Sequence, residues 1–445
     1  MFVYNLRDRR RRPDDARVAI AKHIKGASSP LNRTQIANRY LTFREIIMFQ
    51  SLSALPADPI LRLVAEYRAD TNPNKIDLGI GIYKDENGDT PVMTAVKKAE
   101  QHILTTQMSK KYVGPTGSPE YNEAVAELLF GKTLNTSLGK RRVTVQAPGG
   151  CGGLRLAAEF LKQANADATV WVSDPTWANH IPLMTTAGLK ISKYPYYDYT
   201  THSVRFDEML DCLKTVPKGD IVLLHGCCHN PCGADLTLAQ WQAVRDVALE
   251  QGFTVFIDLA YQGLGDGLEE DMVGTRLMAE SLPELVLVSS CSKNFGLYRE
   301  RTGAMTLICE TDTQTATATT LIAASARAMY SMPPDHGAEV VQLILNNPAL
   351  RSEWDAELTG MRDRINGLRA KLVEQTRKAG IDRDFGFIQN EKGMFSFLGV
   401  NVEQVQTLVR DYSIYLVDSS RINVAGINDA NVEYLADSLA AVIKG

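Results

Sequence analysis

The chain has 445 residues, of which 44% are hydrophobic and 22% charged, and its formal net charge is -4. This length suits roughly two or three domains, and the composition is ordinary for a water-soluble globular protein. The slightly acidic balance argues against a body built to bind nucleic acid, and the sequence lacks a run of roughly 20 apolar residues that could cross a membrane.

The first 47 residues differ from the rest of the chain in charge. They contain the run Arg9 to Arg12 and hold almost all of the excess positive charge. They lack the apolar core of a secretory signal, and the acidic residues beside the arginines fit a mitochondrial transit peptide poorly. We expect residues 1–47 to be a disordered or non-native extension ahead of a start at Met48.

Short β-branched runs alternate with amphipathic stretches between about residues 140 and 310, which is typical of a parallel sheet with crossover helices. The clearest predicted strands are 169–172, 221–224, 254–257 and 285–288. Each strand ends in polar residues. Because open α/β sheets bind their ligands at the carboxyl ends of the strands, a site is expected at that edge.

The glycine-rich run Gly149 to Gly153 precedes a predicted helix over residues 154–161. Glycines allow free N–H groups and the positive end of a helix to approach an anion, so the run is a candidate phosphate site. A simple turn would explain the same residues, and the run alone is weak evidence. Ser290, Ser292 and Arg301 offer further donors suited to phosphate.

The segment His225 to Gly233 follows the strand 221–224 and contains two histidines and three cysteines. Its spacing matches none of the usual zinc patterns, so we predict that the site holds no metal. Asn230 precedes a proline, which suits an amide directed at a ligand oxygen. Cys227 and Cys228 are adjacent, which disfavours a disulfide framework and indicates reduced thiols in a cytoplasmic protein.

Two further polar residues end neighbouring strands. Asp258 follows the strand 254–257, where a buried carboxylate needs a cationic partner such as a protonated ring nitrogen; a helix N-cap is the alternative. Lys293 follows the strand 285–288. A lysine kept dry and near other cations loses its proton easily and becomes a Schiff-base nucleophile, although a single loop lysine is usually solvated.

A long helix is predicted from about residue 350 to 379, because apolar residues recur at steps of three and four from Trp354 to Leu372. Such a helix can link two domains. Beyond it, residues 394–397, 414–417 and 422–424 are predicted strands of a smaller α/β unit.

Six motifs, DPTWANH, HGCCHNPCG, IDLAYQG, SSCSKNFG, ERTGA and SSRINVAG, closely resemble those of the aspartate and aromatic-amino-acid aminotransferases of pyridoxal-phosphate fold type I. The resemblance covers residues 48–445. It implies an α/β fold with a large cofactor-binding domain, whose mostly parallel sheet lies between helices, and a smaller α/β domain. We expect an N-terminal arm at 48–61, the large domain at 91–360 and the small domain at 62–90 and 361–445.

The resemblance implies that pyridoxal 5'-phosphate is the cofactor. Lys293 matches the lysine that bonds to it and then moves a proton during the reaction. Asp258 matches the partner of the ring nitrogen, and His180 supports that aspartate. The other matching cofactor residues are Asn230 and Tyr261 at the ring oxygen, Trp177 stacked on the ring, and Gly150, Cys151, Ser290, Ser292 and Arg301 around the phosphate.

The resemblance also implies how amino acid and 2-oxo acid substrates bind. Arg421 matches the arginine that grips the α-carboxylate, and Gly81 closes over the substrate beside Trp177 and Asn230. Arg327 matches an arginine that reads a side-chain carboxylate across a dimer interface. Tyr112 matches a catalytic-site tyrosine that reaches the phosphate of the neighbouring subunit. A homodimer with shared active sites is therefore implied.

Several residues depart from the family pattern. Cys151 replaces a threonine or serine that donates to the phosphate, Cys232 replaces a common threonine, and Met329 and Met332 replace polar residues near the substrate mouth, whereas Lys84 follows the aspartate type. We predict a ping-pong transfer of an amino group from aspartate to 2-oxoglutarate, with phenylalanine and tyrosine as further donors. An enzyme acting primarily on aromatic amino acids is the alternative.

Two other interpretations share the same fold. In one, the protein is a regulator whose basic front binds DNA, although 47 residues are too few for a winged helix and a linker. In the other, the same site catalyses β-decarboxylation or a lyase step, which would release pyruvate or alanine from aspartate without an acceptor.

Overall fold

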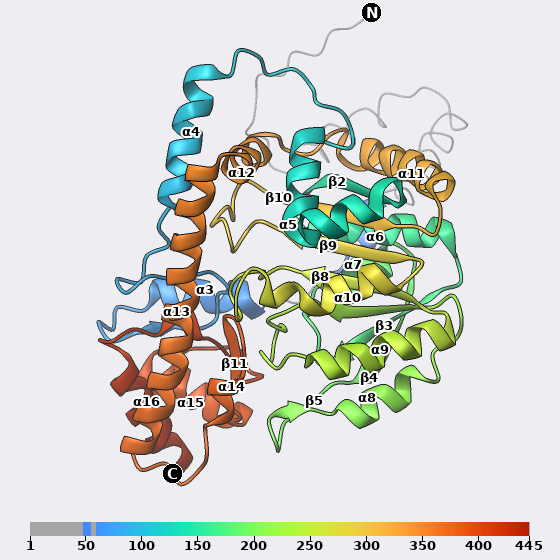
Figure 1. Cartoon of the computed structure of the whole chain (residues 1–445). Coiled ribbons are helices and arrows are strands. Elements are labelled where there is room, and N and C mark those ends of the chain that lie inside the picture. The colour runs from blue at the N-terminus through green and yellow to red at the C-terminus, as the bar shows by residue number, and fades with distance from the viewer. Residues whose placement is uncertain (1–47, 55–58, 445) are drawn as a thin grey trace, which may run out of the picture. The chain divides into compact units, whose positions relative to one another are not determined.

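The computed structural model describes residues 48–54 and 59–444 (Figure 1). The chain divides into two units, residues 1–58 and 59–445. The described part of the first unit contains one short 3-10 helix, η1 (Met48–Ser51). The prediction made for residues 1–47, and the part of the predicted arm at 55–58, lie outside the described residues.

The second unit is built on a seven-stranded sheet. Its strand order is β2-β10-β9-β8-β7-β3-β4, and only β10 runs antiparallel to its neighbours. The four predicted strands are confirmed as β3, β7, β8 and β9, and the mostly parallel sheet agrees with the predicted fold. The strands are β2 (Arg142–Pro148), β3 (Thr169–Asp174), β4 (Lys190–Pro195), β7 (Ile221–His225), β8 (Thr254–Leu259), β9 (Leu285–Ser290) and β10 (Thr302–Ile308).

Helices cover both faces of this sheet, and alternate side chains of each strand point into the two cores that result. Leu223 of β7 packs in one core with residues of α6, α7 and α11, whereas its neighbour Leu224 packs in the other core with residues of α5, α8, α9 and α10. The covering helices are α6 (Gly149–Ala164), α7 (His180–Thr186) and α11 (Asp312–Tyr330) on one face, and α5 (Pro119–Leu138), α8 (Phe206–Leu213), α9 (Leu238–Gln251) and α10 (Val273–Ser281) on the other.

The predicted long helix is confirmed as α13 (Pro348–Lys378), which begins at a proline and is capped by the side chain of Asn347. Figure 1 shows it running from α4 (Thr94–Thr106) to α16 (Val432–Lys444). Trp354 of α13 is fully buried, and its indole Nε1 donates to the carbonyl oxygen of Asn294 at 2.7 Å. The helix thus fixes the backbone beside Lys293, and truncation of this indole to alanine is expected to cost roughly 3–5 kcal/mol.

The residues after α13 form small paired strands, and the three predicted segments there are confirmed as strands, two of them shortened and the third shifted by one residue. β11 (Phe395–Phe397) pairs antiparallel with β13 (Arg421–Asn423), and β12 (Ile414–Tyr415) pairs parallel with β1 (Ile76–Asp77) from the front of the unit. The remaining elements are α3 (Pro59–Ala69), η2 (Gly139–Arg141), β5 (Tyr197–Asp198), β6 (Ser203–Val204), η3 (Glu270–Met272), α12 (His336–Asn346), α14 (Phe387–Asn390), α15 (Val402–Tyr412) and η4 (Val424–Gly426).

The pairing of β1 with β12 joins residues from the two predicted segments of the small domain. The boundaries predicted for the arm and the two domains stay predictions. Among the described residues, every helix is too short or too polar to span a membrane.

Candidate active site

A cavity of about 260 Å³ lies at the carboxyl ends of β7, β8 and β9, at the edge of the sheet where the sequence predicted a site. Twelve of the predicted site residues line it. They are Gly81, Gly150, Cys151, Trp177, Asn230, Asp258, Tyr261, Ser290, Ser292, Lys293, Arg301 and Arg421.

Lys293 lies in the turn that follows β9, and its Nζ is 4.8 Å from the centroid of the Tyr261 ring. Burial lowers the pKa of Lys293, the charge of Arg301 lowers it further, and the carboxylate of Asp258 opposes the shift. The amine therefore gives up its proton more easily than a solvated lysine does. A neutral amine in this place can act as a nucleophile or accept a proton.

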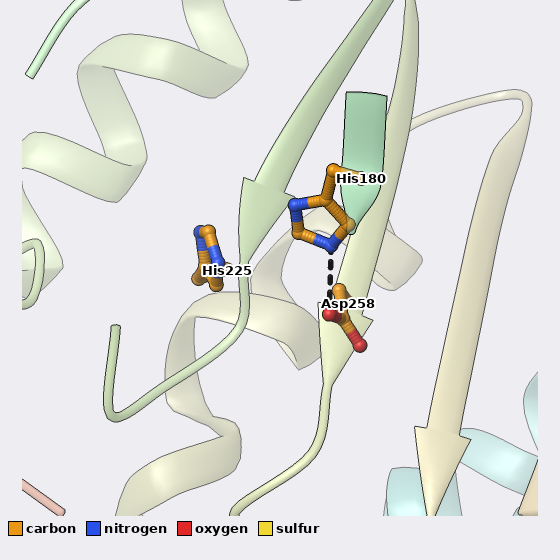
Figure 2. A group of neighbouring side chains, drawn as sticks. All are labelled: His180, His225 and Asp258. Carbon is orange, nitrogen blue, oxygen red and sulfur yellow. Dashed lines mark hydrogen bonds and ion pairs between the residues drawn. The ribbon is translucent and has the colours of Figure 1, made fainter. Parts of the chain in front are cut away.

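Asp258 and His180 form a buried hydrogen-bonded pair, shown in Figure 2. The Nε2 of His180 is 2.9 Å from the Oδ2 of Asp258, and the Nδ1 is 2.8 Å from the hydroxyl of Thr176. Burial alone would raise the pKa of Asp258, but the hydrogen bond to His180 and the neighbouring charges lower it below its ordinary value. The carboxylate thus stays ionised and can pair with a cation in the cavity.

His225 lies beside this pair, as Figure 2 shows, and it also lines the cavity. Both of its ring nitrogens are buried and have no hydrogen-bond partner among residues 48–54 and 59–444, and its ring centroid is 3.9 Å from that of His229. Burial and the nearby His180 lower the pKa of His225 to about 3, so this imidazole is neutral.

Ligand atoms of His180, His225 and Asp258 lie close enough together to hold a metal ion, as do those of Cys227, Cys228 and Asp271. The His180–Asp258 hydrogen bond already uses two of the atoms in the first group. The prediction that the site holds no metal stays a prediction.

The glycine-rich run starts helix α6 and comes unusually close to Arg301. Gly149 has φ +67°, and a Cβ placed there would lie 2.4 Å from a guanidinium nitrogen of Arg301. The hydroxyl groups of Ser290 and Ser292 are 3.1 Å apart and line the same corner of the cavity. Helix N-terminal N–H groups, two hydroxyls and an arginine together form a receptor for an anion.

Cys151 is the third residue of α6 and contributes a half-buried thiol to this corner. Its Sγ accepts a contact from the Nδ2 of Asn179 at 3.7 Å. Because a thiol is a weak hydrogen-bond donor, this position offers the anion less than a hydroxyl would.

A second cation lies at the opposite wall of the cavity. Arg421 is 7% exposed, its Nη2 donates to the carbonyl oxygen of Gly79 at 2.7 Å, and its Nε has no partner in the part of the chain that the structure describes. Burial lowers the pKa of Arg421. Within the described residues neither Arg421 nor Arg301 forms an ion pair, so both keep their charge available for ligand anions.

The amide of Asn230 is 7% exposed and lines the cavity with an unpartnered oxygen. An unsatisfied buried amide costs free energy, so a ligand that supplies a hydrogen bond here is favoured. Tyr261 lies nearby, and burial followed by the charge of Asp258 raises the pKa of its hydroxyl, which therefore remains a donor.

Three sequence-predicted residues lie elsewhere. His180 lies behind the cavity, where it was predicted to support Asp258. The side chain of Tyr112 is 89% exposed, and Arg327 is exposed in the last turn of α11; neither lines the cavity. Lys84 is turned toward Asp77, with 2.8 Å between its Nζ and the carboxylate.

Sequence reasoning did not place seven of the lining residues in the site, namely Ile60, Leu154, His225, Cys227, Ala260, Tyr298 and Phe395. Phe395 matters most, because its ring lies 4.6 Å from the guanidinium carbon of Arg421, and a Cβ at Gly81 would lie 2.8 Å from its Cζ. The segment Met394 to Phe397 had been predicted as a strand, but alternation in so short a strand does not tell which aromatic side chain faces a ligand.

Comparison with known proteins gives a consistent family. The family model for aminotransferase class I and II matches residues 73–439. Similar proteins include the aspartate aminotransferase of Escherichia coli (strain K12), 48% identical over 396 residues, and the aromatic-amino-acid aminotransferase of Paracoccus denitrificans, 46% identical over 396 residues. Each alignment covers 89% of this chain and 100% of the relative.

Among solved structures, a similar one is the aromatic-amino-acid aminotransferase from Burkholderia pseudomallei, which is covalently bound to pyridoxal phosphate. Its TM-score is 0.88 at 41% sequence identity, and the match covers 89% of this chain and 100% of that one.

Proposed function

The chain belongs to the class I and II aminotransferases, and on that basis we propose that it is a pyridoxal-phosphate-dependent enzyme that moves an amino group from aspartate to 2-oxoglutarate. The observation that carries the proposal is one cavity that holds a lysine of lowered pKa, an ionised aspartate and two arginines without an ion-pair partner among the described residues. These four groups match the charges of the cofactor and of an amino acid.

The residues of the cavity fit this cofactor. The glycine-rich start of α6, Ser290, Ser292 and Arg301 would hold its phosphate, with Cys151 as a weaker donor. Asp258 would pair with the protonated ring nitrogen. Asn230 and Tyr261 would bond to the ring oxygen, and the indole of Trp177, whose ring centroid is 5.3 Å from that of His180, would cover the ring.

The bound cofactor supplies an aldehyde carbon that bonds to amino groups and a ring that withdraws electrons from the substrate. Lys293 holds and moves the proton, because its lowered pKa leaves the amine able to accept one from the α-carbon. Asp258 keeps its negative charge facing the ring nitrogen, and His180 fixes the orientation of that carboxylate. Arg421 binds and orients the α-carboxylate of either substrate.

The donor preference depends on the side-chain carboxylate. Arg327 is a surface cation in this subunit, so its proposed role requires that it reach the active site of a second subunit, as Tyr112 would for the phosphate. We therefore propose a homodimer with shared sites. The seven cysteines, which all lie in the described part of the chain, form no disulfide, which supports a cytoplasmic location. The small domain that we propose comprises residues 62–90 and 361–445.

A second candidate is an enzyme that acts primarily on aromatic amino acids. The relatives that support it are the aromatic-amino-acid aminotransferases, and the observation in this chain is the apolar wall that Ile60 and Phe395 give the cavity. Met329 and Met332 replace polar residues of the family pattern. If the neighbouring Arg327 reaches the active site of the second subunit, these two methionines would make that site more apolar as well.

Steady-state kinetics with aspartate and phenylalanine separate the two candidates. Replacement Arg327→Ala is expected to lower kcat/KM for aspartate by about 10- to 100-fold and to change phenylalanine little, because only aspartate loses a charge-assisted contact. Arg377→Ala, which removes another exposed helical arginine, is the control. Equal losses for both donors would contradict the role of Arg327, and a wild-type preference for phenylalanine would favour the second candidate.

A further inference from the structure

Arg369 of α13 is almost fully buried, with 1% of its side chain exposed. A guanidinium in such a place is costly unless its donors are satisfied. Here the two terminal nitrogens donate to the backbone of one short segment, whereas the Nε has no partner among the described residues. The Nη1 donates to the carbonyl oxygen of Ile388 at 2.9 Å, and the Nη2 donates to those of Lys392, Gly393 and Phe395 at 3.2, 2.8 and 2.6 Å.

Glu391 balances this charge from within the same segment. One of its carboxylate oxygens is 3.6 Å from the Nη1 of Arg369, and it also accepts hydrogen bonds from the hydroxyls of Tyr197 and Ser396. Glu391 is 3% exposed. The segment 388–396 is therefore tied to α13 on one side and to Tyr197 on the other.

The segment has one residue in the active-site cavity, Phe395. Its backbone is held by Arg369, and its ring touches three cavity residues. It lies 4.6 Å from the guanidinium carbon of Arg421, its centroid is 5.9 Å from that of Tyr261, and it fills the space next to Gly81. Arg421 is thus held between the Phe395 ring and the carbonyl oxygen of Gly79.

We propose that Arg369 is a positioning residue for the substrate carboxylate, which acts by fixing Phe395 under the guanidinium of Arg421. The inference rests on the proposed function, because it assigns Arg421 to that carboxylate. A displaced Phe395 ring leaves the Arg421 guanidinium free to rotate away from its bonding geometry, and a misplacement of this kind weakens binding even when the charge is kept.

The test compares Arg369→Met, Phe395→Leu and the double variant, all loaded with pyridoxal phosphate. The probe is succinate, a dicarboxylate without an amino group, and its dissociation constant is measured by isothermal titration calorimetry. Each single variant is expected to raise the constant about tenfold, and the double variant is expected to add little, because both changes act through one chain of contacts. KM for aspartate should rise more than kcat falls.

Arg141→Met is the matched control, since this half-buried arginine also donates to two carbonyl oxygens, of Cys309 and Pro283, away from the cavity. It is expected to lower the melting temperature without changing succinate binding. If Arg369→Met fails to fold, Arg369→Lys, which keeps the charge but not the forked geometry, takes its place with an expected rise of about threefold.

Succinate binding within twofold of wild type in a folded, cofactor-loaded Arg369 variant would overturn the inference, as would unchanged binding by Phe395→Leu or fully additive effects in the double variant. If the wild-type enzyme itself fails to bind succinate, the result contradicts the proposed function, and the inference about Arg369 is overturned together with it.

Discussion

Arg301 and Arg421 show how the side chains of this cavity are prepared for ligands of opposite charge. Neither arginine has a carboxylate partner among the described residues, and Arg421 is nearly buried. Uncompensated charge in such a place lowers stability, so the arrangement is favourable only when a ligand anion completes it. Asp258 is the complementary case, because it is an ionised acid kept for a cationic ligand atom.

Replacement of the Cys151 sulfur by oxygen tests the proposed phosphate site at the start of α6. Replacement Cys151→Ser is expected to lower the dissociation constant of pyridoxal phosphate by about 3- to 10-fold, because a hydroxyl donates a stronger hydrogen bond than a thiol. An absorbance titration of cofactor-free protein measures the constant, and Cys212→Ser, outside the cavity, is the control. Weaker cofactor binding by Cys151→Ser would show that the thiol is the preferred group at this position.

Asp235 governs a pH dependence of stability. Burial raises its pKa to about 6, although the amide N–H groups of Cys228 and His229 donate to its carboxylate at 2.6 and 2.8 Å. The folded protein therefore holds this proton more tightly than the unfolded chain does. The resulting stabilisation is complete below the unfolded pKa and is lost as the pH rises through about 6.

Urea unfolding at pH 4.5 and pH 7 of the wild type and of Asp235→Asn measures this dependence. The wild type is expected to lose about 2 kcal/mol of stability relative to Asp235→Asn between the two pH values, because part of the stabilisation is already lost at pH 4.5. A difference between the two proteins that does not change with pH would contradict the raised pKa.

The elements that sequence could predict are those with strong repeating patterns. β-branched runs indicated β3, β7, β8 and β9, and the spacing from Trp354 to Leu372 indicated α13. The edge strands β2 and β4 and the antiparallel β10 were not among the clear predictions, because polar residues or glycine interrupt their apolar residues and their place is decided by pairing with distant strands. The two-residue strands β1 and β12 are too short to show a pattern of their own, and each forms by pairing with the other across the sequence.

Two helical glycines allow a matched test at the scale of an element. A Cβ at Gly360 of α13 would meet no atom within 4 Å, whereas one at Gly153 of α6 would lie 2.8 Å from a methyl carbon of Val288. Gly360→Ala is expected to raise the free energy of unfolding by about 0.5–1 kcal/mol, because alanine loses less backbone entropy in a helix. Gly153→Ala is expected to lower it by roughly 1–3 kcal/mol. Denaturant titration measures both, and loss of stability in Gly360→Ala would mean that this glycine serves a bend in α13.

At the scale of the whole molecule, strand-end residues and the motifs of the family resemblance together located most of the cavity. Twelve predicted residues meet there, brought together from segments as distant as Gly81 and Arg421. Phe395 and Arg369 could not be found in this way, because their importance comes from contacts across the fold rather than from local pattern. Tyr112 and Arg327 lie outside the cavity, and a single subunit contains nothing that tests their predicted roles.

Mixed dimers test whether two subunits share a site. Neither Lys293→Ala nor Arg327→Ala is expected to convert aspartate efficiently alone. If Arg327 serves the neighbouring subunit, a mixed dimer has one complete site, and equal random mixing should restore about a quarter of wild-type activity. A mixture of each variant with itself is the control. Absence of recovery in verified mixed dimers would contradict the shared arrangement.

The central claim, that Lys293 catalyses transamination, is tested most directly by a single half-reaction without an acceptor. Cofactor-loaded enzyme mixed with excess aspartate should release about one oxaloacetate per active site and stop, and added 2-oxoglutarate should restart turnover. Lys293→Ala, loaded with the same cofactor, should release almost none. Continued release of pyruvate or alanine without an acceptor, or an undiminished burst from Lys293→Ala, would contradict the account.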